Sequence, residues 1–202
     1  MNREMKNHLK VVYKTLEESR LFEHAGRLVS FDRQTVCPRE GVQRQGEIGA
    51  HLSNRAYAIK KDRAFIKSVE TLYKKREELG EPERVLVRAL HREYLRTKNI
   101  STKEAHRYAL IYNRAFGDWL RAKEASDFSL FADSLRAVRD AELEQVKRSN
   151  DKKKTTYDAL LDRYERGMTG AVLDETFEAC KERLVPFMKK IKSPKRSSAR
   201  TF

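Results

Sequence analysis

Hydrophobic side chains recur every three or four positions along almost the whole sequence, which is the spacing of one face of an α-helix. Met5, Leu9, Val12 and Leu16 begin the pattern. The segment 30–41 interrupts it and contains the first proline, so it is expected to be a connection. The pattern predicts helices over about residues 5–29, 43–60, 63–79, 82–98, 102–122, 130–146, 157–164 and 170–191.

Residues at the helix ends support these boundaries. Asp62 and Thr169 stand where an N-cap is needed, and Pro82 stands where the first turn of a helix tolerates proline. Ser101 and Glu104 have the spacing of a capping box. The side chains expected to face inward in the third to sixth helices are Phe65, Val69, Leu72, Leu79, Leu86, Leu90, Tyr94, Ala105, Tyr108, Tyr112, Ala115, Trp119, Ala122, Phe131, Leu135, Val138 and Val146.

Two helices carry special positions. Gly46 and Gly49 lie inside the second helix, where each glycine costs about 1 kcal/mol relative to alanine, so we expect a neighbouring helix to approach closely there. In the last helix, apolar positions alternate by four and three residues, which is typical of a seam that packs on a partner helix. Pro186 lies within that helix and is expected to kink it. The seam consists of Leu173, Phe177, Cys180, Leu184, Phe187 and Ile191.

Composition favours helices over sheets. Ala, Glu, Lys, Leu and Arg make up half of the 202 residues, whereas there are only 8 Gly and 4 Pro. This excludes a β-sandwich or β-barrel, and the recurring apolar positions exclude global disorder. The sequence therefore predicts an all-α fold, an array of about seven to eight long antiparallel helices with no sheet, in one helical region over residues 1–192.

The chain is basic, with 44 Lys and Arg against 30 Asp and Glu, a net charge of +14. Such a charge suggests binding to phosphates, but positive and negative residues are interleaved as on a solvated helix surface. Only residues 147–154 and 189–200 are one-sided, and they are interpreted as an exposed linker and part of a tail. The Ser-rich tail 193–202 is expected to be disordered. Nucleic acid is therefore not favoured as a partner.

Nothing in the sequence suggests a membrane or an oxidising compartment. No segment approaches the roughly 20 apolar residues that cross a bilayer, and residues 1–10 lack the apolar centre of a signal peptide. Cys37 and Cys180 do not belong to a CxxC motif, and free thiols are favoured over a disulfide. These features predict a cytoplasmic protein.

The histidines do not form a recognisable metal site. His8, His24, His51, His91 and His106 include no pair four residues apart, whereas a helical zinc hydrolase of the HExxH kind needs two imidazoles on one face with a glutamate between them.

Three other patterns resemble functional sites but are better explained by structural roles. Glu4 with His8, and Glu47 with His51, lie one turn apart, and each is interpreted as an ion pair or a satisfied histidine. Gly41–Gly46 imitates a phosphate loop but is followed by Glu47 where lysine is required. The third pattern is a carboxylate cluster interpreted as favourable charge near a helix start, Asp174, Glu175 and Glu178. The sequence thus assigns no catalytic, cofactor-binding or metal-ligating residue.

Three stretches nevertheless resemble one family. Residues 30–41, with Arg44, are similar to a family segment SWDxxTxMPxxG, with Phe31 in place of Trp and Cys37 in place of Met. Residues 119–131 are similar to AKxxNDFxxF, with Ser126 in the Asn position. Residues 157–169 are similar to YDALLDxYEPGMT, with Arg166 in place of Pro, and the likeness continues through Leu173, Phe177 and Leu184 to Pro186. The family is the carboxypeptidase Taq family of zinc metallocarboxypeptidases, and the resemblance runs from about residue 5 to 192.

The resemblance implies a mostly helical fold around a long groove, usually in a homodimer, that uses zinc or another divalent metal to release C-terminal amino acids from peptides. It also implies that the metal ligands and substrate contacts lie downstream of the matched region, so none can be assigned to this chain. After Ile191 the family continues with further helices, whereas this sequence turns to its basic tail. We therefore hypothesise a truncated product of a frameshift, an early stop or a split gene.

Three functional hypotheses follow. The first is an N-terminal portion of a metallocarboxypeptidase that is inactive alone. The second is a free-standing basic helical module that binds nucleic acid or a partner protein. The third is one half of a split enzyme that docks onto a missing C-terminal half, or otherwise self-associates, through its exposed apolar faces.

Overall fold

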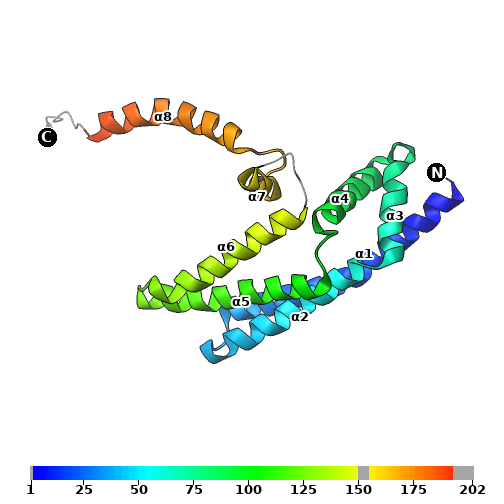
Figure 1. The fold of residues 1–202 in the computed structure, drawn as a ribbon, viewed down its shortest axis with the longest axis horizontal. Helices are drawn as coiled ribbons and strands as arrows, with labels where there is room; N and C mark the ends of the chain where they lie inside the picture. Colours follow the sequence, from blue (N-terminus) through cyan, green and yellow to red (C-terminus); the bar gives the residue numbers. More distant parts are fainter. Residues whose placement is uncertain (1, 150–154, 193–202) are drawn as a thin grey trace, which may run out of the picture. The chain divides into compact units, whose positions relative to one another are not determined.

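A computed structural model describes residues 2–149 and 155–192 (Figure 1). Among these residues it has eight α-helices, two short 3-10 turns and no strand, which confirms the expected all-α fold. The elements are α1 (Arg3–Thr35), η1 (Arg39–Gly41), α2 (Val42–Lys60), α3 (Arg63–Lys74), η2 (Arg76–Glu78), α4 (Glu81–Thr97), α5 (Thr102–Ala125), α6 (Ser129–Ser149), α7 (Thr156–Tyr164) and α8 (Gly170–Lys192). None of these helices combines the length and apolar composition that crossing a bilayer requires.

The chain divides into two compact units, residues 1–150 and 151–202. In the first, α1 and α2 form an antiparallel pair joined by a short connection, and α5 and α6 form another. Contacts between α2 and α5 join the two pairs, while α3 packs on α1 and on α4. The expected tail, 193–202, lies outside the described residues, as does most of the charged linker.

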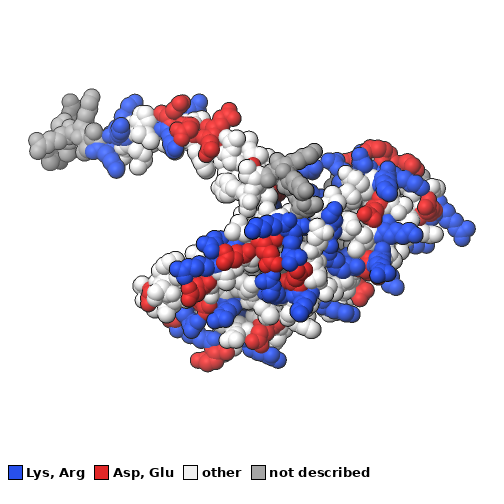
Figure 2. All heavy atoms as spheres, in the orientation of Figure 1, with Lys and Arg blue, Asp and Glu red and all other residues white. Residues whose placement is uncertain are grey.

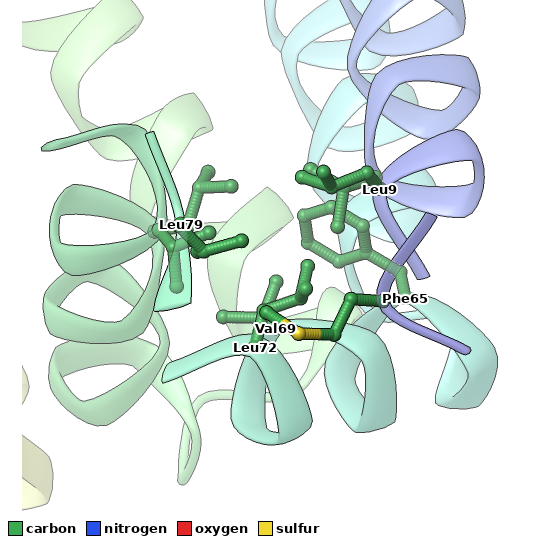
Figure 3. Packing of buried hydrophobic residues seen from close by; sticks show 9 residues of the cluster. Leu9, Phe65, Val69, Leu72 and Leu79 are labelled. Carbon is green, nitrogen blue, oxygen red and sulfur yellow. The ribbon is translucent and has the colours of Figure 1, made fainter. Parts of the chain in front are cut away.

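The main core lies where α1, α3 and α4 meet (Figure 3). Its apolar side chains follow the helical spacing of the sequence, and Met5, Val12 and Leu72 are fully buried. Val87 is also fully buried, although the sequence pattern placed Leu86 inward instead. Leu86 packs at the edge of the same cluster. The buried cluster consists of Met5, Leu9, Val12, Phe65, Val69, Leu72, Leu79, Val87 and Leu90.

The expected helix caps are present. The Asp62 carboxylate accepts hydrogen bonds from the backbone N–H groups of Ala64 (2.8 Å) and Phe65 (3.0 Å) at the start of α3. Ser101 and Glu104 form the reciprocal capping box of α5. Each cap satisfies backbone donors that a helix start leaves unpaired, which is why these boundaries could be read from the sequence.

Two helix ends differ from expectation. α1 continues to Thr35 rather than ending near Val29, because side chains in its last turns bond back along the helix. The Gln34 amide donates to the Ser30 hydroxyl (2.9 Å), and the Thr35 hydroxyl donates to the Phe31 carbonyl (2.7 Å). The third helix ends at Lys74, earlier than predicted, and η2 then redirects the chain before Leu79, which is buried in the core.

The inward faces predicted for the fifth and sixth helices are correct only in part. In α5, Tyr108, Ala115 and Ala122 are buried, but Trp119 is 40% exposed. In α6, Leu135 is 42% exposed, and the buried residue is Ala141. α6 packs mainly on α5 and to a lesser extent on α4.

Tyr57 connects three helices in the middle of the first unit. Its hydroxyl donates to the carbonyl oxygen of Ile100 (2.7 Å) and lies 3.2 Å from that of Thr97, so α2 is bonded to the connection between α4 and α5. Burial raises the pKa of Tyr57 to about 12. The folded chain therefore keeps this proton at pH values where the unfolded chain, with a tyrosine pKa near 10, has lost it.

Stability should consequently fall as the pH rises from about 10 to 12, because the unfolded state binds fewer protons there. Tyr57→Phe should cost about 1–2 kcal/mol at pH 7 through the lost hydrogen bonds, and it should flatten the alkaline loss. Urea unfolding at pH 7 to 11 measures both effects. Tyr164→Phe is the matched control, since Tyr164 is 92% exposed, and a control loss equal to that of Tyr57→Phe would contradict this role.

The second unit consists of α7, α8 and the turn between them. Thr155 caps α7 by accepting from the Asp158 N–H (3.0 Å). Thr169 accepts from the Val172 N–H (3.3 Å) at the start of α8, as predicted. α8 continues through Pro186 as one helix and appears bowed in Figure 1.

Candidate functional site

A groove of about 1280 Å³ lies between the start of α2 and the second half of α5. Its walls carry four acidic and four basic side chains, so it has no net charge. Arg39 and Glu124 form an ion pair along it. The charged residues that line it are Arg39, Glu40, Glu47, Arg114, Asp118, Arg121, Lys123 and Glu124.

Asp118 is the most buried carboxylate of this groove, only 8% exposed. Burial opposes its ionisation, but hydrogen bonds from Ser134 and Arg121 outweigh that effect and lower its pKa. Asp118 therefore stays ionised near neutral pH and would make a poor general acid. No histidine lines the groove. The groove thus combines apolar lining residues such as Leu110 and Leu120 with balanced charges.

A smaller cavity of about 530 Å³ lies between α1 and α2 and is lined by Arg33 and Lys60. The Arg33 guanidinium lies 4.4 Å from the centre of the Phe116 ring and donates to the Asn113 side chain. Desolvation lowers the pKa of Arg33. Arg33 thus joins α1 to α5, where a cation stacked on an aromatic ring stabilises the contact.

Lys60 has an equivalent role at the other end of this cavity. Its ammonium group lies 3.2 Å from carboxylate oxygens of both Glu23 and Glu93, which joins α2 to α1 and to α4. Burial opposes the charge of Lys60, but the two carboxylates outweigh it and raise its pKa. Sequence reasoning did not single out Arg33 or Lys60 as special, because their partners are 33 to 80 residues away and no local pattern connects them.

The close helix approach predicted for the second helix occurs at Gly46. A Cβ atom built there would lie 3.0 Å from Arg33 Nη1 and 3.2 Å from Asn113 Cβ. At Gly49 the nearest atom would be 3.9 Å away, an ordinary contact. The prediction is therefore confirmed for Gly46, where α2 meets α5, and Gly49 is not a point of comparable crowding.

The five histidines lie at separate places in the fold, and two of them join helices. His8 Nδ1 lies 3.0 Å from the hydroxyl of Ser68, which is 2% exposed, so this half-buried pair joins α1 to α3. His91 stacks on Tyr73 with 3.6 Å between ring centres, and burial lowers its pKa. His24 and His51 are exposed, and His106 Nδ1 is buried without a hydrogen-bond partner in the described structure.

The acidic residues considered above also have structural partners. Glu4 binds Lys75 (2.9 Å) rather than His8, and Glu47 binds Arg44 (3.1 Å) rather than His51. Residues 42–46 are helical, so they do not form a phosphate loop. Asp174, Glu175 and Glu178 lie beyond the first turn of α8, farther from the helix start than expected. Within the described ranges, no group of three or more His, Cys, Asp or Glu side chains could hold a metal ion.

The two basic clusters fall partly outside the described residues, which exclude 150–154 and 193–202. In the first cluster, Arg148 is held by Glu144 (3.0 Å) and Glu104, so its charge is already neutralised. Figure 2 shows positive and negative side chains intermixed over the visible face of the first unit, as the sequence predicted. Cys37 and Cys180 are free thiols, also as predicted.

The first two motif stretches build connections between helices. The Asp32 carboxylate accepts from the Gln45 amide (2.9 Å), which fixes the end of α1 against α2. Ser126 adopts a left-handed conformation (φ 52°) at the end of α5, a conformation in which asparagine is enriched, and this fits the Asn of the similar family segment. Asp127 then caps α6 by accepting from the Ser129 N–H (2.9 Å).

The third motif stretch forms the turn between α7 and α8. Asp162 accepts from the N–H of Gly167, whose φ of 85° requires glycine, and Asp158 accepts from the N–H of Gly170 (2.7 Å). These two carboxylates are therefore backbone-binding groups that shape the turn. Each of the three stretches thus contains at least one residue that shapes a helix end or a turn.

Comparison with known proteins agrees with the family resemblance found in the sequence. A model of the carboxypeptidase Taq (M32) metallopeptidase family matches residues 11–202. Carboxypeptidase 1 of Bacillus subtilis is 28% identical over 195 residues, which cover 93% of this chain and 37% of the relative.

Solved structures show the same fold. The crystal structure of BsuCP has a TM-score of 0.85 and 27% identity, covering 93% of this chain and 37% of that one. The structure of Pyrococcus furiosus carboxypeptidase has a TM-score of 0.75 and 25% identity, covering 96% of this chain and 38% of that one. This chain thus spans somewhat more than a third of the length of the relatives it matches.

Proposed function

Because this chain belongs to the carboxypeptidase Taq (M32) metallopeptidase family, we propose that it is the helical N-terminal portion of a metal-dependent carboxypeptidase and does not cleave peptides alone. The observation that carries the proposal is the match over residues 11–202 to a family in which B. subtilis carboxypeptidase 1 is more than twice as long as this chain. The proposed substrates of the whole enzyme are peptides, from which it would release C-terminal amino acids. The proposed metal is zinc or another divalent ion.

The chemistry of peptide hydrolysis explains why this portion alone would not cleave peptides. A metallopeptidase needs a bound metal ion to activate water and polarise the scissile carbonyl, and the metal needs several His, Asp, Glu or Cys ligands. The 202 residues contain no HExxH sequence. Among the described residues, His8 and His91 make contacts between helices, and Asp118 is held by Ser134 and Arg121. We therefore propose that the rest of such an enzyme supplies the metal ligands. This chain would form one wall of the substrate cleft beside the metal site.

The groove beside α5 supports this role. Asp118 is held by hydrogen bonds from Ser134 and Arg121 and remains ionised, so it offers no proton for catalysis. The exposed ion pair of Arg39 with Glu124 places opposite charges along the rim. A surface of this kind can form one side of a substrate channel. Side chains along it would position a peptide next to a metal ion that the rest of the enzyme binds.

The purified chain provides the first test. With Zn²⁺ or Co²⁺ added, it should release no amino acid from N-blocked peptides above the buffer rate, measured by mass spectrometry over several hours. B. subtilis carboxypeptidase 1 is the positive control under the same conditions. Sustained release that a chelator abolishes would contradict the proposal, because it would require a complete metal site within this chain.

A further inference from the structure

Two glycines on facing helices, Gly26 of α1 and Gly49 of α2, line the cavity of about 530 Å³ between these helices. A Cβ atom built at either position would meet nothing closer than 3.9 Å, so crowding between the helices does not require glycine there. An interior glycine nevertheless makes a helix less stable than alanine does. Larger side chains at these positions would occupy the cavity, so we interpret both glycines as residues that keep it open.

The walls of this cavity carry an excess of positive charge. Three basic side chains line it, Arg27, Arg33 and Lys60, and one acidic side chain, Glu23. Lys60 is held by Glu23 and by Glu93, whose carboxylate oxygens each lie 3.2 Å from its ammonium group. Even when both carboxylates are counted, three positive charges face two negative ones. The excess lies with the two arginines, because Lys60 is already paired.

Arg33 has only neutral partners in the described part of the chain. Its Nη1 donates to the side chain of Asn113, and its guanidinium lies on the ring of Phe116. Its Nε is buried and makes no hydrogen bond to any described residue. Desolvation lowers the pKa of Arg33, as expected for a charge that is withdrawn from water without a carboxylate beside it. An anion bound in the cavity would stabilise this guanidinium.

Hydroxyl groups add hydrogen-bond donors to the lining. Ser30 of α1 and Ser53 of α2 both line the cavity. The Ser30 hydroxyl accepts a hydrogen bond from Gln34, which leaves its own hydrogen free to donate. Gln45 also lines the cavity, but its amide donates to the Asp32 carboxylate (2.9 Å). The groups that suit an anion are therefore the two arginines and the two serines.

From the open cavity and its excess of positive charge we propose that it binds an organic phosphate monoester. The phosphate group has three acceptor oxygens and a charge of about −2 near neutral pH, so it can engage both Arg27 and Arg33. Its organic group would lie on Phe22 and Val29, which also line the cavity. The volume is within the range of small-molecule sites, roughly 300–1,000 Å³. This inference does not rest on the peptidase role proposed above.

Isothermal titration calorimetry of the full chain at low salt tests the proposal, with phenyl phosphate as the probe. We expect a dissociation constant on the order of 0.1–1 mM. Inorganic phosphate should bind at least about threefold more weakly, because it leaves the apolar wall uncovered. Benzoate should bind at least about tenfold more weakly, because a carboxylate engages fewer donors. No binding at about 20 mM phenyl phosphate would overturn the proposal, and so would either other anion binding as tightly.

Two pairs of variants test whether the probe occupies this cavity. Arg27→Gln should raise the dissociation constant at least about fivefold, whereas Arg20→Gln, at an exposed arginine of α1 outside the lining, should change it less than about twofold. Gly49→Leu fills the cavity without changing a charge and should raise the constant at least about tenfold. Gly117→Leu is its control, because a Cβ atom at this interior position of α5 meets nothing within 4 Å.

Arg33 is kept in all variants, because it also joins α1 to α5. Circular dichroism establishes that each variant is folded. Binding that is equally strong in both members of either pair would overturn the assignment to this cavity. The Arg27→Gln pair decides the outcome should Gly49→Leu fail to fold, because Arg27 is exposed and its replacement leaves the packing of α1 on α2 intact.

Discussion

Replacing Gly46 by valine should lower the free energy of unfolding by about 2–3 kcal/mol, because the new side chain would enter the contact between α2 and α5. The first added carbon would already lie 3.2 Å from Asn113 Cβ and 3.0 Å from the Arg33 guanidinium. Two further methyl groups cannot be placed without separating the helices. The same displacement would break the bond from Arg33 to Asn113.

The matched control is Gly49→Ala in the same helix. Its added carbon meets nothing closer than 3.9 Å, so the change should stabilise the chain by up to about 1 kcal/mol through helix propensity. Urea unfolding followed by circular dichroism measures both variants. Since Trp119 is the chain's one tryptophan and packs on Phe116, its fluorescence reports the same region. If Gly46→Val proved as stable as the parent, α2 and α5 would not meet as closely as described.

Much of the fold could be predicted because its determinants are local. The caps at Asp62 and Ser101 and the spacing from Met5 to Val12 each involve residues within one or two turns of a helix. Such signals survive in a single sequence because helices are stabilised by neighbours three and four residues apart. Gly46 could also be predicted, since an interior glycine with a cost in helix propensity implies a compensating contact.

The failures have a common cause in contacts between distant residues. The exposure of Trp119 and Leu135 depends on which helices cover α5 and α6, and helical spacing alone does not specify this. The sequence pattern predicts that α1 ends near Val29, because the apolar spacing stops there. The helix itself continues to Thr35. Hydrogen bonds from Gln34 and Thr35 to residues one turn earlier continue the helix through that break.

In the candidate site, too, local features could be predicted from the sequence, whereas features formed by distant residues could not. The absence of HExxH is readable from the sequence alone, whereas the groove is formed by η1, α2 and α5 and needs the tertiary structure. The resemblance of three short stretches identified the family, and the structure explains why these stretches are recognisable. Asp32 and Asp158 hold connections between helices by hydrogen bonds, and Gly167 adopts a positive φ in the turn before α8.

The central claim is that this chain can serve as the N-terminal wall of a metallocarboxypeptidase, and a chimera tests it most directly. Residues 1–192 would replace the matched portion of B. subtilis carboxypeptidase 1, which is 37% of that protein. The controls are the relative without that portion and this chain alone. Circular dichroism and metal content establish that each protein is folded and loaded.

The measurement is the rate at which the chimera releases C-terminal amino acids from peptides. We expect release that a chelator abolishes, at least about 100-fold faster than from either control, because the wall positions the substrate beside the metal. A folded and metal-loaded chimera without activity, or a relative that remains fully active without any such portion, would contradict the account.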